Sequence, residues 1–270
     1  MIHPLRFIQA RYQNYILNHF PKTRHGRYMK KIHNSHMGES CFIIGNGPSL
    51  KAEDLTTLHS LGIHSFAVNR IYKIFDQTSW RPTYYVNTDA LLIKDNLDAV
   101  NAIDSPYKLT PLQNKYYLGI NIKGAHHFFR NDIRANDQVE KFALDCTKQV
   151  NVRGTVTIAC MQLAIHMGYR HIYLLGIDHN FDKIMTETGE IIIDPSVKNY
   201  FCDGYDDDVA SEVKHNLGKT TRAYMDLNKF VDKYDISIYN ASRQTKLEVF
   251  PKVTFEEALR DIKERNPHGK

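Results

Sequence analysis

Several short apolar stretches of this sequence end in polar residues that could contact a ligand. Asn69 and Asn87 come directly after such stretches, Asn46 follows one after a single glycine, and Asp178 follows another. Carboxamides can donate and accept hydrogen bonds without adding charge, which suits the bases and sugar hydroxyls of nucleotides. Any one of these asparagines is explained as well by a turn or a cap. Taken together, they predict one polar ligand-binding edge, with Asp89 just beyond the third stretch.

A glycine-rich turn follows the first apolar stretch, at residues 45–50. Gly45 and Gly47 permit a tight turn and a close approach of backbone N–H groups to a ligand. After Pro48, Ser49 could cap a helix whose positive end favours an anion. The pattern lacks the Gly-Lys-Ser/Thr of a P-loop and the third glycine of the dinucleotide fingerprint. It predicts a phosphate site, and a tight turn without a ligand is the alternative.

A second cluster with possible chemistry precedes an apolar helix expected at residues 155–167. Arg153 could pair with a phosphate or carboxylate through two hydrogen bonds, although a surface salt bridge explains it equally well. Thr155 opens the helix, and the strand expected after it ends in Gly176 and Asp178. Right-handed crossover connections bring the start of this helix to the same edge as the strand ends.

Strands that end at one shared edge require a parallel sheet with helical connections. We therefore expect an α/β fold, a Rossmann-like, doubly wound and mostly parallel sheet. The catalytic domain is expected at residues 39–270, with a lid-like insertion at about residues 180–218, after a basic N-terminal helical arm at residues 1–38. Strands are expected at residues 42–44, 64–69, 83–87, 116–122, 171–178 and 236–240, and helices at 51–61, 91–100, 155–167 and 255–265, with another after the insertion.

Composition narrows the function classes. The chain has 270 residues, 42% of them hydrophobic, and a formal net charge of +5. This charge suits an anionic ligand or membrane surface but is too small to indicate nucleic acid binding. No stretch is long and apolar enough to span a bilayer, and no secretory signal is recognised, so a cytoplasmic location is expected. The four cysteines are widely spaced, which predicts reduced thiols and no metal site.

Two alternatives stay open for the basic arm at residues 1–38. Its basic and aromatic residues could bind anionic lipid at the inner face of the membrane. They could equally form a helix that docks on the domain or on a second subunit of a homo-oligomer.

The order of these motifs resembles the bacterial sialyltransferases of glycosyltransferase family 42, over roughly residues 41–250. The shared Gly-Asn-Gly-Pro-Ser-Leu lies at residues 45–50, and an Arg-x-Thr is matched by Arg153 and Thr155. The resemblance implies a CMP-sialic acid donor, bound at this turn and by Asn69 and Asn87. It implies a general base in a His-x-x-Gly segment, matched by His215. The family's segment Gly-Tyr-x-x-Ile-Tyr-Leu-x-Gly-Ile-Asp is matched by residues 168–178.

The sequence differs from that family at two positions, and both differences bear on which donor sugar is bound. Val156 replaces a serine, and Asn180 replaces a tyrosine that supports the leaving phosphate. Lys214 or Tyr205 could take over that support. The expected activity is transfer of a nonulosonic acid from a CMP-linked donor to a glycan or lipid-linked glycan, with no cofactor required.

The same motifs resemble related Rossmann-like proteins, including 6-hydroxymethylpterin diphosphokinase-like members. That reading predicts a diphosphokinase that uses ATP, with Mg²⁺ held by Asp89 and Asp178 between the phosphates. A non-catalytic nucleotide-binding module is a third alternative. Dependence on Mg²⁺ distinguishes the diphosphokinase from the glycosyltransferase. Turnover, measured as hydrolysis of a nucleotide sugar, distinguishes an enzyme from the non-catalytic module.

Overall fold

All five residues of β1 (Ser40–Ile44) are buried, which is typical of a strand covered on both faces of a parallel sheet. Cys41 and Ile43 contribute to one hydrophobic core, and Phe42 and Ile44 to a second. The strand therefore lies inside a layered fold with helices on each side. The computed structural model describes residues 15, 18–94, 96–131, 142, 144–152, 154–186, 188–205 and 216–265.

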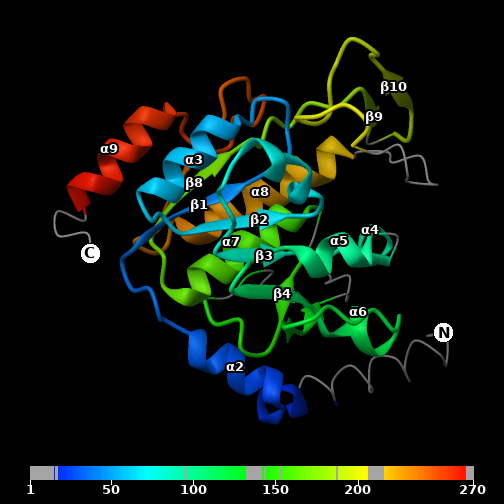
Figure 1. The fold of residues 1–270 in the computed structure, drawn as a ribbon, viewed down its shortest axis with the longest axis vertical. Helices are drawn as coiled ribbons and strands as arrows, with labels where there is room; N and C mark the ends of the chain where they lie inside the picture. The colour runs from blue at the N-terminus through cyan, green and yellow to red at the C-terminus, as the bar shows by residue number, and fades with distance from the viewer. Residues whose placement is uncertain are drawn as a thin grey trace.

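The central sheet has seven strands in the order β11-β8-β1-β2-β3-β4-β5, and all neighbouring pairs are parallel (Figure 1). The chain runs from β1 outward to β5 and then returns to β8 on the other side of β1. A crevice at the carboxyl ends of the strands is expected where the order reverses, between β1 and β8. The predicted Rossmann-like α/β fold is confirmed. The other strands of this sheet are β2 (Ser65–Val68), β3 (Tyr84–Val86), β4 (Tyr107–Pro111), β5 (Ala125–Phe128), β8 (His171–Leu175) and β11 (Ser237–Asn240).

Helices cover both faces of the sheet. One core joins the sheet to α2 (Arg24–Ile32), α7 (Val156–Met167) and α8 (Leu217–Val231). The other joins it to α3 (Ala52–Ser60), α5 (Leu97–Ala102) and α9 (Phe255–Arg265). The remaining described elements are η1 (Phe20–Lys22), η2 (Ile71–Gln77), α4 (Ala90–Lys94), α6 (Leu112–Tyr116), the parallel pair β6 (Arg130–Asn131) and β7 (Val150–Asn151), and the antiparallel pair β9 (Lys183–Met185) and β10 (Ile191–Ile193).

The strand predicted at residues 116–122 is wrong. That segment is the end of α6 followed by a turn, in which Gly119 has φ +68° and the Ile120 N–H donates to the Asn114 carbonyl (3.0 Å). Tyr116 and Tyr117 are exposed. The strands of this region are β4 and β5 instead, and the single helix predicted at residues 91–100 is the two short helices α4 and α5.

The described part of the basic arm packs against the domain. Phe20 is 1% exposed and Met29 is 0% exposed, and both belong to the core beside α7. The Met29 carbonyl lies 2.8 Å from Nε2 of the buried His166 on α7. Residues 1–14 and 16–17 lie outside the described residues, so lipid binding by the start of the arm stays a prediction. Among the described helices, none has both the length and the apolar character that crossing a bilayer requires.

We expect Gly45→Ala to destabilise the fold more than Gly62→Ala. A methyl group on Gly45 would overlap the Gly176 carbonyl oxygen, which is backbone and cannot rotate away, so we expect a loss of about 3 kcal/mol in the free energy of unfolding. Gly62 has φ +64° and open space around it, so its substitution costs only about 1–2 kcal/mol of backbone strain. Denaturant unfolding measures both, and equal losses would contradict the role of close packing at Gly45.

Candidate functional site

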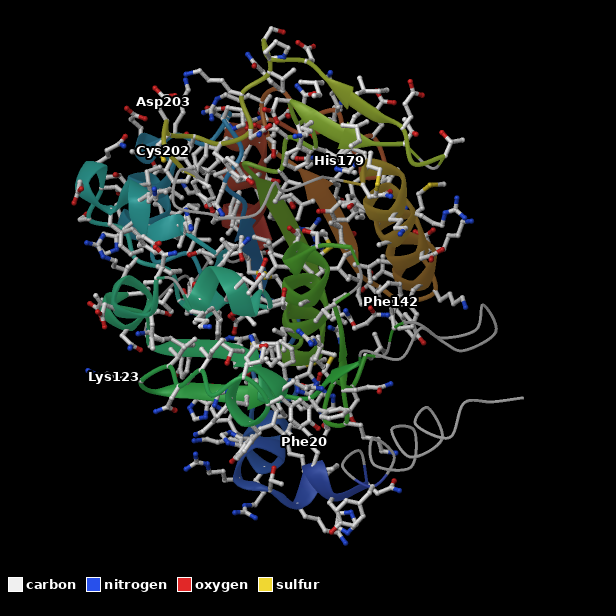
Figure 2. All side chains as sticks on the ribbon, turned by 90° about the vertical axis from the view of Figure 1, so that its right-hand side faces the viewer. Phe20, Lys123, Phe142, His179, Cys202 and Asp203 are labelled. Atoms are coloured by element: carbon white, nitrogen blue, oxygen red, sulfur yellow. The ribbon has the colours of Figure 1, made fainter. Side chains whose placement is uncertain are left out.

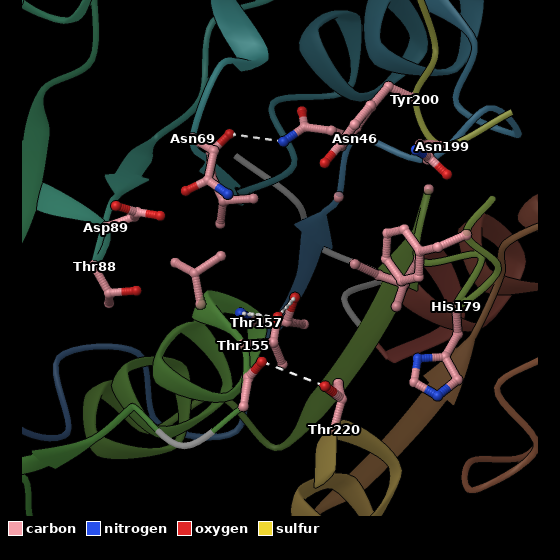
Figure 3. Close-up of a pocket in the computed structure, with 18 of the residues that line it drawn as sticks. Asn46, Asn69, Thr88, Asp89, Thr155, Thr157, His179, Asn199, Tyr200 and Thr220 are labelled. Carbon is pink, nitrogen blue, oxygen red and sulfur yellow. Dashed lines mark hydrogen bonds between the residues drawn. The ribbon is translucent and has the colours of Figure 1, made fainter. Parts of the chain in front are cut away.

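A cavity of about 650 Å³ opens at the carboxyl edge of the sheet, where the strand order reverses. Its size is within the usual range for small-molecule sites. The ends of β1, β2 and β8, the loop after β3, the starts of α7 and α8, and residues 199–205 form its wall (Figure 3). The predicted residues that line it are Gly45, Asn46, Gly47, Asn69, Asp89, Thr155, Gly176, Asp178 and Asn180.

The glycine turn after β1 packs tightly against the end of β8. The Gly45 N–H donates to the Leu175 carbonyl (2.8 Å), and the Gly47 N–H donates to the Gly176 carbonyl (2.9 Å). A methyl group on Gly47 would lie 2.6 Å from Oδ2 of Asp178. The two glycines thus allow the backbone of this turn to contact the backbone at the end of β8. Their N–H groups already donate to protein carbonyls, and a phosphate contact by this turn stays a prediction.

Ser49 completes this junction and does not cap α3. Its N–H donates to Oδ2 of Asp178 (2.7 Å), and its hydroxyl donates to Oδ1 of the same carboxylate. Helix α3 has Lys51 as its N-cap, without a side-chain cap. Burial raises the pKa of Asp178, and the two hydrogen bonds from Ser49 act against that rise. Pro48 is exposed and Ser49 is buried, and neither lines the cavity.

The three strand-end asparagines form two hydrogen-bonded groups. Asn46 donates from Nδ2 to the Val68 carbonyl (3.1 Å), and its buried Oδ1 has no hydrogen-bond partner in the described structure. Asn87 is 1% exposed, does not line the cavity, and donates from Nδ2 to Oδ1 of Asn69 (3.3 Å). The Asn69 amide nitrogen is therefore left as a donor and Asn46 Oδ1 as an acceptor at the same side of the cavity (Figure 3).

The start of α7 lines the cavity, as do the starts of α4 and α8. Residues 154–157 line the cavity, and Thr155 caps the helix by accepting a hydrogen bond from the Thr157 N–H (3.3 Å). All residues of this 12-residue helix are buried. Its positive end favours an anion, so the helix that could hold a phosphate is α7 and not α3. Arg153 lies outside the described residues, and Arg130 on β6 also lines the cavity.

The two carboxylates expected to hold Mg²⁺ already accept hydrogen bonds from the protein. Asp89 is exposed, and its Oδ1 accepts from the N–H groups of Leu91 (2.9 Å) and Leu92 (3.3 Å) at the start of α4. Both oxygens of Asp178 accept from Ser49. Among the described residues, two groups of side chains are spaced for a metal ion, and neither lines the cavity: His33, Asp145 and His166, and His36, Glu39 and His64.

Residues 199–205 of the predicted lid close one side of the cavity. The Phe201 N–H donates to the Asn46 carbonyl (3.0 Å), and the Arg70 N–H donates to the Tyr205 hydroxyl (3.1 Å). The rings of Tyr200 and Tyr205 stack, with their centroids 3.9 Å apart and an angle of 11° between the ring planes. Both residues line the cavity. This part of the insertion is therefore fixed to the ends of β1 and β2. His215 and Lys214 lie outside the described residues.

The sequence interpretation overlooked His179, which lines the cavity from the loop after β8. Figure 2 shows it far from Phe20 of the basic arm, and Figure 3 shows it beside Thr220 of α8. The sequence contains one signal for it, because His179 follows Asp178 directly at the predicted ligand edge. The packing of α8 beside this loop could not be predicted from spacing.

Comparisons with solved structures identify similar folds. The MAf glycosyltransferase from Magnetospirillum magneticum AMB-1 has a TM-score of 0.52 and 13% identity, and the match covers 88% of this chain. The chain spans only 38% of that protein's length. The sialyltransferase CstII from Campylobacter jejuni, solved with the substrate analogue cytidine-5'-monophosphate, has a TM-score of 0.47 and 16% identity, covering 81% of this chain and 86% of that one. The monofunctional alpha-2,3-sialyltransferase Cst-I from the same organism has a TM-score of 0.48 and 15% identity, with 81% of each chain covered.

No curated protein sequence matches the chain. The family model described as 6-hydroxymethylpterin diphosphokinase MptE-like matches residues 14–183. These residues include the glycine turn, the strand-end asparagines, Asp178 and His179, and they make up more than half of the sequence. The chain therefore belongs to the 6-hydroxymethylpterin diphosphokinase MptE-like family.

Proposed function

We propose that this chain is a glycosyltransferase that takes a sugar, a nonulosonic acid, from a CMP-linked donor and transfers it to a glycan or lipid-linked glycan acceptor. The observation that carries the proposal is the cavity at the reversal of strand order. Its wall combines amide and hydroxyl groups with the positive end of α7. Such a site can hold a phosphate and a nucleoside through hydrogen bonds and a helix dipole.

Each part of the donor has a candidate partner in the cavity. Thr155 and the start of α7 would bind the phosphate, together with Arg153, which stays a prediction. The Asn69 amide nitrogen and Asn46 Oδ1 would contact the nucleoside as donor and acceptor. A buried acceptor without a partner costs about 1–3 kcal/mol, which a hydroxyl or amino group of the ligand would offset. The choice of cytidine rests on the sequence resemblance at residues 45–50.

A Mg²⁺-dependent diphosphokinase is the second candidate, because the family's description names that activity. It would need carboxylates that hold the ion between phosphates. Asp89 and Asp178 both line the cavity, but Asp89 caps α4 and Asp178 binds Ser49. Their existing hydrogen bonds favour the metal-independent proposal. The general base assigned from the resemblance, His215, stays a prediction.

We expect CMP to stabilise the protein more than CDP, UDP, GDP or ATP, with or without Mg²⁺. At a concentration of 100 times Kd a ligand adds about 2.7 kcal/mol, which corresponds to a Tm increase of roughly 5–10 °C for a domain of this size. A thermal-shift panel measures this effect. Stabilisation by ATP alone, and only with Mg²⁺, would favour the diphosphokinase.

We expect turnover of a CMP-linked sugar to continue in excess EDTA, because the proposed phosphate partners are hydroxyl, amide and guanidinium groups. Release of CMP from CMP-sialic acid is the measurement, with and without added acceptor glycan. Complete loss of turnover that Mg²⁺ restores would contradict the metal-independent mechanism. Binding of CMP without turnover of any nucleotide sugar would leave the non-catalytic module as the better description.

We expect Asn69→Gly to weaken CMP binding by about fivefold, because it removes one hydrogen-bonding side chain worth about 1 kcal/mol. Asn69 has φ +52°, and glycine tolerates that conformation, so the substitution should preserve the fold. Asn34→Gly is a matched control, because Asn34 has φ +56° and lies outside the cavity wall. Calorimetry gives both Kd values. Equal values for the two variants would remove Asn69 from the nucleotide site.

A further inference from the structure

His179 combines several features that the nucleotide site does not explain. Its half-buried imidazole lines the cavity, and Figure 3 shows it on the α8 side, opposite Thr88 and Asp89 in that view. Its ring meets the ring of Tyr224 edge to face, with centroids 5.9 Å apart at 77°. The side chain is thus held by α8 while it faces the space where a donor would bind.

The backbone of His179 is strained. Its φ is +54°, a left-handed conformation that is uncommon for residues other than glycine. Of the described non-glycine residues with positive φ, Asn34, Asn69 and His179, the last two line the cavity. Strain of this kind costs about 1–3 kcal/mol and is concentrated at functional sites. The turn after β8 therefore holds this imidazole in place at an energetic cost.

The hydrogen bonds around His179 determine which ring nitrogen carries the proton. Nε2 of His179 lies 2.8 Å from the Thr221 hydroxyl oxygen. That hydroxyl has one hydrogen, which it donates to the Leu217 carbonyl (2.8 Å). Thr221 can therefore only accept from the ring, and Nε2 must carry the proton. Nδ1 then keeps its lone pair, and no described residue is recorded as its hydrogen-bond partner.

The surroundings also keep the ring uncharged at neutral pH. Burial lowers the pKa of His179 below its usual value of 6.5. The titratable groups beside it are Tyr224, whose pKa burial raises to about 12, and the preceding Asp178, whose carboxylate is held by Ser49. Neither adds a positive charge. An uncharged imidazole with a bare Nδ1 is a competent proton acceptor.

We propose that Nδ1 of His179 is the general base of the transfer, an inference that rests on the glycosyltransferase function proposed above. The bond between the anomeric carbon and the phosphate oxygen breaks, and CMP leaves with the electron pair. The acceptor oxygen forms the new bond to the anomeric carbon, and its proton moves to Nδ1. Thr221 is a positioning residue, because it acts on the substrate only through the imidazole.

The decisive experiment compares three His→Gln variants: His179→Gln, His215→Gln and His59→Gln, the last on the exposed surface of α3. CMP release from CMP-sialic acid and CMP affinity are measured for each. Loss of a general base lowers turnover by about 10²–10⁴-fold. We expect this loss in His179→Gln, with CMP affinity unchanged, and near-normal turnover in His59→Gln. Turnover in His215→Gln tests the base that the sequence resemblance implies.

The outcomes separate the two proposals. Normal turnover in His179→Gln, or a large loss confined to His215→Gln, would overturn the assignment of His179 and leave the glycosyltransferase function intact. A wild-type protein that binds CMP but turns over no CMP-linked sugar would overturn the proposed function, and the base assignment with it. Loss of CMP binding in His179→Gln would make this residue part of the nucleotide site instead of the base.

Thr221 provides a second test, with a readout that a purely structural role would not change. Thr221→Val removes the acceptor for Nε2, so we expect kcat to fall about tenfold with KM little changed, and Thr221→Ser to restore it. Because the base acts in its uncharged form, turnover in the wild type should rise with pH and reach half its maximum below pH 6.5. Nitrogen NMR should find the proton on Nε2 in the wild type. A proton on Nδ1, or no recovery in Thr221→Ser, would overturn the assignment.

Discussion

The close approach of two backbones at the centre of the sheet is the constraint on which the rest of the site depends. The turn after β1 and the end of β8 are joined by hydrogen bonds from Gly45 and Gly47, and a side chain at either glycine would overlap the opposite strand end. Asp178 completes the junction through Ser49. These contacts use the N–H groups of Gly45, Gly47 and Ser49. The proposed phosphate site therefore depends on the start of α7, which also lines the cavity.

Most of the fold could be predicted because its signals are local. Local sequence patterns predict the apolar strand β1 and the glycine turn after it. They also predict α7, with Thr155 as its N-cap and Gly168 as its C-cap. The sequence pattern predicts a strand at residues 116–122, because aromatic and apolar residues are common in strands. Two local features prevail there: the left-handed Gly119 and the bond from Ile120 to Asn114. The true edge strand, β5, contains two histidines and carries a weaker pattern.

The candidate site was predictable where it depends on strand ends, and not where it depends on tertiary packing. Asn46, Asn69 and Asp178 converge because parallel strands end at one edge. The same reasoning could not show that Asn87 lies behind the wall, supporting Asn69 from below the surface. Nor could it reveal His179, because the residue that fixes its tautomer lies on α8, 42 positions later in the sequence.

Residues with left-handed backbone conformations lie on two sides of the cavity. On the β1 and β2 side, Asn69 is held in a left-handed conformation next to the unpartnered Asn46 Oδ1, an arrangement suited to recognising a fixed pattern of donors and acceptors. On the α8 side, the left-handed His179 presents a bare nitrogen. The start of α7 is part of the same wall. A phosphate held at that helix end would share one cavity with the groups proposed to recognise the nucleoside and with the group proposed to accept the proton, and a nucleotide-linked sugar presents a part for each of them.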